Sequence, residues 1–165
     1  MTRPPVEGEL AIRELYARYC WALDTGDTDA LVACFTDDAR MVEEVFEDAD
    51  VWEGHAGIRG LAQHYFNAPG FPGRQHHVTQ IQYTPQADGT VRLRSFAFVT
   101  ECEGEPPYVL RFTGWYEDHA VKSADGRWRF RERTIRLWDG AVLRKFPGRG
   151  EWTPRKRPDS LIIRR

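Results

Sequence analysis

The second half of the chain constrains the fold most, because residues 74–139 alternate between long apolar-rich stretches and short turn sequences. β-Branched and aromatic residues fill these stretches, which is typical of strands, and the connections ADG, GEPP and ADG are turn formers. Short connections join antiparallel neighbours, so we predict an antiparallel meander. Its strands are RQHHVTQIQYTP (74–85), TVRLRSFAFVTECE (90–103), YVLRFTGWYEDHAV (108–121) and RWRFRERTIRLWD (127–139).

This meander carries bulky residues on both faces. In the stretch 90–103, Val91, Leu93, Ala97 and Val99 alternate with Arg92, Arg94, Phe96 and Phe98. A sheet that is apolar on much of both faces needs cover on both sides. We expect helices on one side and a second copy of the chain on the other, and therefore a homodimer or higher homo-oligomer.

The first half is helical. Residues 8–24 place apolar side chains at three- and four-residue spacing, and Gly26 ends the pattern. A second short helix over 28–35 begins at an Asp27 or Thr28 cap, and a third covers 55–68. Short strands are expected at 39–46 and 51–54. Helices followed by a meander define an α+β domain. The buried stripe of the first helix comprises Ile12, Leu15, Tyr16, Tyr19, Cys20 and Leu23.

Composition excludes several classes of function. The formal net charge of −2 gives no general attraction to nucleic acid or an anionic membrane. No stretch is long and apolar enough for a membrane span, and no signal peptide is recognised. The three cysteines lie far apart in apolar segments, which favours free thiols and a reducing, cytoplasmic location. Motifs for a metal, a nucleotide or a flavin are missing, so we expect no cofactor.

The last part of the chain differs in charge from the rest. Residues 144–165 are rich in arginine and lysine, whereas residues 1–143 contain the predicted domain. We expect this basic tail to pack on its own domain or on a partner subunit. An arm that binds nucleic acid is the alternative.

Four segments carry a resemblance to a known family: residues 12–41, WEGHAGIRGL (52–61), RQHHVTQIQ (74–82) and residues 112–140. In order and spacing they resemble the SnoaL-like family of the nuclear transport factor 2-like superfamily. The resemblance implies a cone, in which three N-terminal helices wrap a strongly curved antiparallel sheet around an apolar pocket. The superfamily includes dehydratases, isomerases, cyclases, hydrolases and noncatalytic proteins, so the fold alone does not give the activity.

The resemblance also implies catalytic residues. In scytalone dehydratase and bile acid dehydratase relatives, an aspartate on the first helix pairs with a histidine on the following long strand, and a tyrosine lines the same pocket. Asp24, His76 and Tyr19 match these positions. A carboxylate bonded to one ring nitrogen would orient the imidazole as a general base. Without the resemblance, the expected role of Asp24 would be a cap at the end of its helix.

Two histidines stand side by side at the start of this strand, and neighbours in a strand point to opposite faces. The resemblance assigns the pocket to His76 and the other face to His77. A one-residue slip in register would exchange them, so His77 stays open as the alternative.

Further residues are expected to bind substrate. Arg133 matches a pocket arginine of several relatives, with Arg136 as the alternative. Scytalone dehydratase has a second pocket histidine, and near its position this chain has Thr100 and Glu101, which puts a two-histidine mechanism in doubt. The remaining predicted wall and mouth residues are Tyr16, Trp115, Trp52, Phe66 and Phe71.

These features predict a cofactor-independent lyase, of the dehydratase type, or an isomerase that acts on a hydrophobic, cyclic small molecule from polyketide or steroid metabolism. Noncatalytic binding or assembly is the alternative, since the small subunit of ring-hydroxylating dioxygenases shares the implied fold. An epoxide hydrolase, in which Asp24 would activate water, is a third possibility, but its clustered Asp and Arg residues are not evident.

Overall fold

A computed structural model describes residues 4–68, 71, 73–102, 108–138, 142 and 156–159. Within these residues the elements follow the order α1 (Val6–Thr25), α2 (Thr28–Val32), β1 (Phe35–Glu44), β2 (Asp50–Glu53) and α3 (Gly54–Phe66). Then come β3 (Arg74–Pro85), β4 (Val91–Glu101), β5 (Val109–Lys122) and β6 (Trp128–Leu137). The predicted α+β class, with helices followed by a meander, is confirmed.

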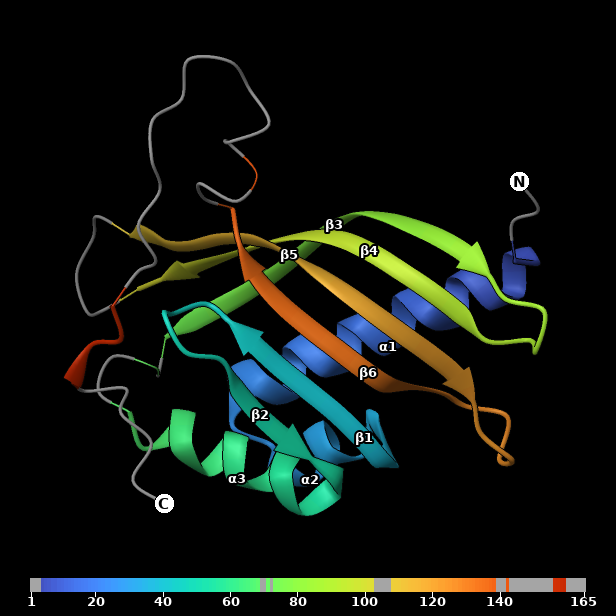
Figure 1. The fold of residues 1–165 in the computed structure, drawn as a ribbon, viewed down its shortest axis with the longest axis horizontal. Coiled ribbons are helices and arrows are strands. Elements are labelled where there is room, and N and C mark those ends of the chain that lie inside the picture. Colours follow the sequence, from blue (N-terminus) through green and yellow to red (C-terminus); the bar gives the residue numbers. More distant parts are fainter. Residues whose placement is uncertain are drawn as a thin grey trace.

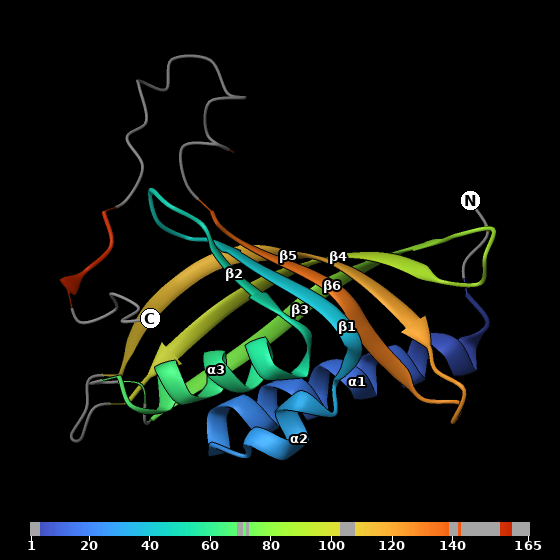
Figure 2. The ribbon, with the colours of Figure 1, turned by 60° about the horizontal axis from the view of Figure 1, so that its bottom comes forward.

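The described strands form one curved sheet in the order β2-β1-β6-β5-β4-β3. Figure 1 looks onto its convex face, with α1 behind the strands. Figure 2 shows the sheet arching over α1, α2 and α3, which lie together under its concave face. We call the space between the concave face and these helices the interior.

One strand pairing differs from the prediction. β3, β4, β5 and β6 pair antiparallel as expected, but β1 runs parallel to β6, with Met41 opposite Arg133. Hairpin connections fix the direction of sequential strands, whereas β1 and β6 are joined through β2, α3 and the rest of the meander. So long a connection permits a parallel pair.

Buried α1 side chains pack against the sheet in the interior. Ile12, Leu15 and Tyr19 are almost fully buried, as the helical spacing predicts. The helix ends where Gly26 takes a left-handed backbone (φ 78°) and its N–H bonds the carbonyl of Ala22. Glycine adopts this conformation without steric cost, so the turn fixes where the last helical turn, with Asp24, meets the sheet.

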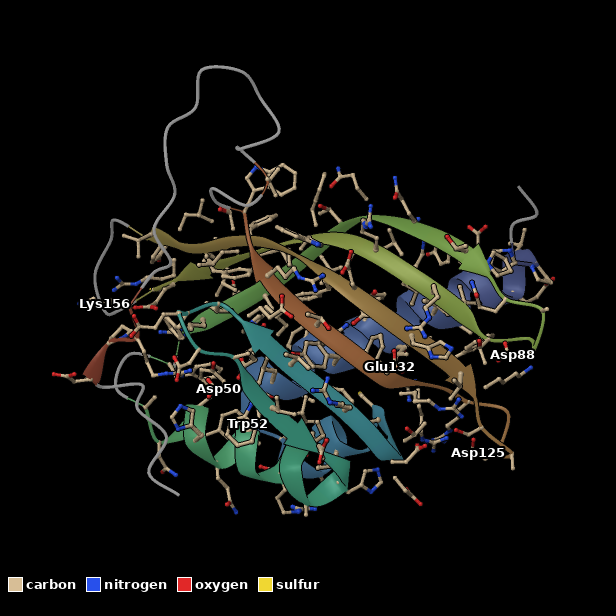
Figure 3. All side chains as sticks on the ribbon, in the orientation of Figure 1. Asp50, Trp52, Asp88, Asp125, Glu132 and Lys156 are labelled. Carbon is tan, nitrogen blue, oxygen red and sulfur yellow. The ribbon has the colours of Figure 1, made fainter. Side chains whose placement is uncertain are left out.

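The described part of the basic tail contacts the β1–β2 connection. Arg157 bonds Asp50 at 2.5 Å, and its guanidinium lies 4.8 Å from the centre of the Phe46 ring. Figure 3 labels Lys156 and Asp50 on the same side of the molecule. Most of residues 144–165 lie outside the described residues, so the predicted packing of the tail as a whole stays a prediction.

Candidate functional site

Asp24 and His76 meet in the interior. Oδ1 of Asp24 lies 2.5 Å from ring Nδ1 of His76. Oδ2 of Asp24 accepts a hydrogen bond from the backbone N–H of His76 at 2.8 Å. The two side chains are 15% and 12% exposed. Donation from Nδ1 to the carboxylate leaves the lone pair on Nε2, which has no bonding partner among the described residues. The arrangement is that of an oriented base.

The second histidine of the pair points away from this site. The His77 ring stacks on Phe98 with 4.5 Å between ring centres, and its Nε2 lies 3.1 Å from the hydroxyl of Thr100. Phe98 belongs to the outward set of β4, whereas its neighbour Val99 is buried. Alternation along β3 therefore turns His76 toward α1 and His77 toward the convex face.

A buried ion pair lies deeper in the interior. Arg133 has no exposed side-chain surface and bonds Asp118 through Nε at 2.7 Å and Nη2 at 3.0 Å. Tyr16 donates its hydroxyl to the same carboxylate at 2.5 Å. The predicted substrate contacts Tyr16 and Arg133 are thus both bonded to Asp118. Arg136, the alternative, lies on the convex face with Glu44 and Glu117.

Tyr19 packs directly against this ion pair. The centre of its ring lies 4.0 Å from the Arg133 guanidinium, and Phe130 lies at the same distance. Burial raises the pKa of Tyr19, and the nearby Arg133 opposes this change in part. The phenol therefore keeps its proton at neutral pH and can act as a hydrogen-bond donor.

Aromatic side chains connect His76 with α3. Phe71 lies 6.3 Å from the His76 ring, 5.2 Å from Tyr65 and 5.9 Å from Phe66, measured between ring centres. Phe71 thus lies beside His76, and Phe66 lies beside Phe71, while their role at a pocket mouth stays a prediction. Trp52 approaches α3 so closely that a Cβ on Gly57 would come 2.9 Å from its backbone.

Trp115 is not part of this group. It lies on the convex face with Trp138, 5.8 Å between ring centres, and opposite Phe96 and Arg136 in the sheet. Its neighbour Tyr116 takes the inward position, because side chains alternate along β5. The prediction that Trp115 binds substrate in the pocket is therefore wrong.

Sequence reasoning missed two inward acidic residues, Asp118 and Glu43. Glu43 accepts hydrogen bonds from Trp52 at 2.9 Å and from Tyr65 at 2.7 Å. Period-two counting places Glu43 on the face of buried Met41 and Asp118 on that of buried Tyr116. This alternation is the sequence signal from which both buried acids could have been predicted.

Glu101 has a different environment from Glu43. It is buried between Arg74 at 2.9 Å and Arg111 at 3.0 Å. Burial alone would raise the pKa of Glu101, but the hydrogen bonds from the two arginines outweigh it and lower the pKa. The residue near the position of the missing second histidine is therefore an ionised carboxylate.

The described residues hold neither a membrane-spanning helix nor a cluster of metal ligands. None of the described helices is long and apolar enough to cross a membrane. No group of three or more histidine, cysteine, aspartate or glutamate side chains in the described part of the chain is arranged to hold a metal ion.

Comparison with known families identifies the class of protein. The SnoaL-like domain matches residues 4–134. The chain therefore belongs to the SnoaL-like domain family, as the resemblance of its segments indicated. A comparison with curated proteins gave no significant match.

Solved structures share this fold. A variant of Rv3472, a protein of unknown function from Mycobacterium tuberculosis, is 27% identical, with a TM-score of 0.68 over 81% of this chain and 77% of that one. An NTF2-like protein with a cystatin-like fold from Novosphingobium aromaticivorans is 25% identical, with a TM-score of 0.72 over 85% and 88%. A protein of the same organism named for scytalone dehydratase is 21% identical, with a TM-score of 0.68 over 81% and 86%. The last likeness concerns the fold alone.

Proposed function

We propose that this protein is a cofactor-independent lyase, of the dehydratase type, or an isomerase that acts on a hydrophobic, cyclic carbonyl compound. The observation that carries the proposal is the double hydrogen bond by which Asp24 holds the ring and the backbone of His76. A general base must present a free lone pair in a fixed direction, and Nε2 of His76 has both properties.

Dehydration and isomerisation begin with the same step. His76 Nε2 removes a proton from the carbon next to the carbonyl group, and the electrons of the C–H bond move toward the carbonyl oxygen. Tyr19 is the proposed hydrogen-bond donor to that developing oxyanion, a type of interaction that strengthens in the transition state. The bulky rings around His76 favour an apolar substrate, which agrees with a role in polyketide or steroid metabolism.

Exchange of the abstracted proton with solvent tests the proposal. We choose α-tetralone in D₂O as the probe, because it is an apolar bicyclic ketone with acidic protons next to its carbonyl. The protein should incorporate deuterium at that carbon, and mass spectrometry measures the rate. His76→Ala should slow exchange by about 10²- to 10⁴-fold, the usual contribution of a positioned base.

The matched control is His77→Ala, which removes the neighbouring imidazole from the convex face and should exchange at the rate of the unmodified protein. Exchange no faster than in buffer, or equal rates for His76→Ala and the unmodified protein, would refute the proposed function. A protein of the noncatalytic binding class would give the first of these results.

A further inference from the structure

Glu43 is a buried acid that the proposed base mechanism does not use. It lies on β1, and only 6% of the residue is exposed. Its side chain is held between the sheet and α3, because Tyr65 of α3 donates to Oε1 and Trp52 of β2 donates to Oε2. Both donors are neutral.

The other buried carboxylates of the described residues are all bonded to arginine. Asp118 pairs with Arg133, and Asp50 pairs with Arg157. Glu101 lies between two arginines. Among these carboxylates Glu43 is the one that has no cation within ion-pair distance in the described part of the chain.

This environment favours a protonated Glu43. Burial raises its pKa from 4.5 to about 7, while the hydrogen bonds from Tyr65 and Trp52 lower it. The charged groups that face it also act in opposite directions, since Asp50 raises the pKa and Arg157 lowers it. Near neutral pH, a carboxyl group with this pKa can either give or take a proton.

Glu43 and His76 both face the interior, from strands near opposite edges of the sheet. β3 forms one edge of the described sheet, and β1 is next to the other edge. The curved sheet arches over the helices between these two edges (Figure 2). Tyr65, which bonds Glu43, contacts Phe71, and Phe71 contacts the His76 ring. The same aromatic group therefore borders both residues.

We propose that Glu43 is the acid that complements His76 in the interior and that it protonates the hydroxyl group that leaves during dehydration. This inference rests on the proposed function. After His76 Nε2 has taken the proton next to the carbonyl, the enolate electrons form the new C=C bond as the C–O bond of the β-hydroxyl breaks. Glu43 gives its proton to the departing oxygen, which leaves as water. The imidazolium proton then returns to the Glu43 carboxylate through water.

Two probes separate the acid step from the base step. 3-Hydroxy-1-tetralone needs both, and its loss of water gives 1-naphthol, which is measured by fluorescence. α-Tetralone exchange in D₂O needs the base alone. Glu43→Gln should slow 1-naphthol formation by about 10²-fold or more, the usual contribution of a positioned acid, and leave α-tetralone exchange almost unchanged.

Glu44→Gln is the matched control, because Glu44 is the next residue on the same strand and bonds Arg136 on the convex face. It should leave both rates unchanged. If Glu43→Gln slows both probes equally, or neither, Glu43 is not the acid. If the unmodified protein exchanges no deuterium into α-tetralone, the proposed function fails first and the role of Glu43 fails with it.

Tyr65→Phe adds a readout that a merely structural role would not change. Elimination that needs protonated Glu43 should fall as pH rises through the pKa of about 7. Loss of the Tyr65 hydrogen bond raises that pKa further, so the fall in Tyr65→Phe should move to higher pH. An unchanged profile would contradict a proton donated by Glu43.

Discussion

At the scale of single residues, the interior combines buried charges that are balanced locally with one acid that is not. Arg133 and Asp118 form a fully buried pair with two hydrogen bonds, and the Tyr16 hydroxyl donates a further hydrogen bond to the Asp118 carboxylate. A buried ion pair is tolerated only when such bonds replace water. The aromatic faces of Tyr19 and Phe130 cover the guanidinium further. The pair adds no net charge to the interior, which suits a neutral carbonyl substrate.

Glu43 gives a prediction about stability. Because its folded pKa of about 7 lies above the ordinary 4.5, the folded state holds a proton that the unfolded state has already released between these pH values. The free energy of unfolding should therefore fall as pH rises from about 4.5 to 7, by about 1–3 kcal/mol from this residue. Urea unfolding of the unmodified protein and of Glu43→Gln at several pH values measures it. The difference between the two proteins should depend on pH, and a constant difference would contradict the account.

The sequence predicted the residues of the site unevenly. The resemblance to the family identified Asp24 and His76, because their positions follow a helix end and a strand start that are visible in the pattern. The choice between His76 and His77 needed the register of β3, which a period-two pattern leaves open. Glu43 was missed because a charged residue on a strand usually faces water, and nothing local distinguishes it from exposed Glu44.

At the scale of elements, local signals worked where neighbouring segments pair with each other. The bounds of β3 are those of the predicted stretch, and Gly26 ends α1 as expected. β1 was the difficult element. It begins at Phe35, earlier than predicted, because pairing of Phe35 with Phe130 of β6 extends it, and α2 ends at Val32 accordingly. Because β6 is almost a hundred residues away in the chain, the local sequence around β1 does not indicate that β1 pairs with it in parallel.

At the scale of the whole molecule, the convex face carries exposed aromatic residues. Phe96 is 44% and Trp138 43% exposed, and the two rings meet edge to face at 5.1 Å. Ion pairs such as Arg94–Glu117 lie on the same face. Both signs of charge beside an aromatic centre suit a two-fold contact between identical surfaces. We propose that a second copy of the chain covers this face.

Sedimentation tests the proposed dimer. The unmodified protein should sediment as a dimer at tens of micromolar, and Phe96→Glu should sediment as a monomer, because the new charge would be buried in the contact. Trp21→Glu is the control, since Trp21 is exposed on α1, under the opposite face, and its change should leave the dimer intact. A monomeric unmodified protein would refute the dimer.

The central claim is that Asp24 acts through His76 in removing a proton, and a double-mutant cycle on α-tetralone exchange tests it most directly. Asp24→Asn should slow exchange strongly, because its amide can donate to Nδ1 and favour the wrong tautomer. Residues that act as a unit are not additive, so Asp24→Asn combined with His76→Ala should be no slower than His76→Ala alone. If the two effects instead multiply, Asp24 and His76 act independently, and the account of an oriented base is wrong.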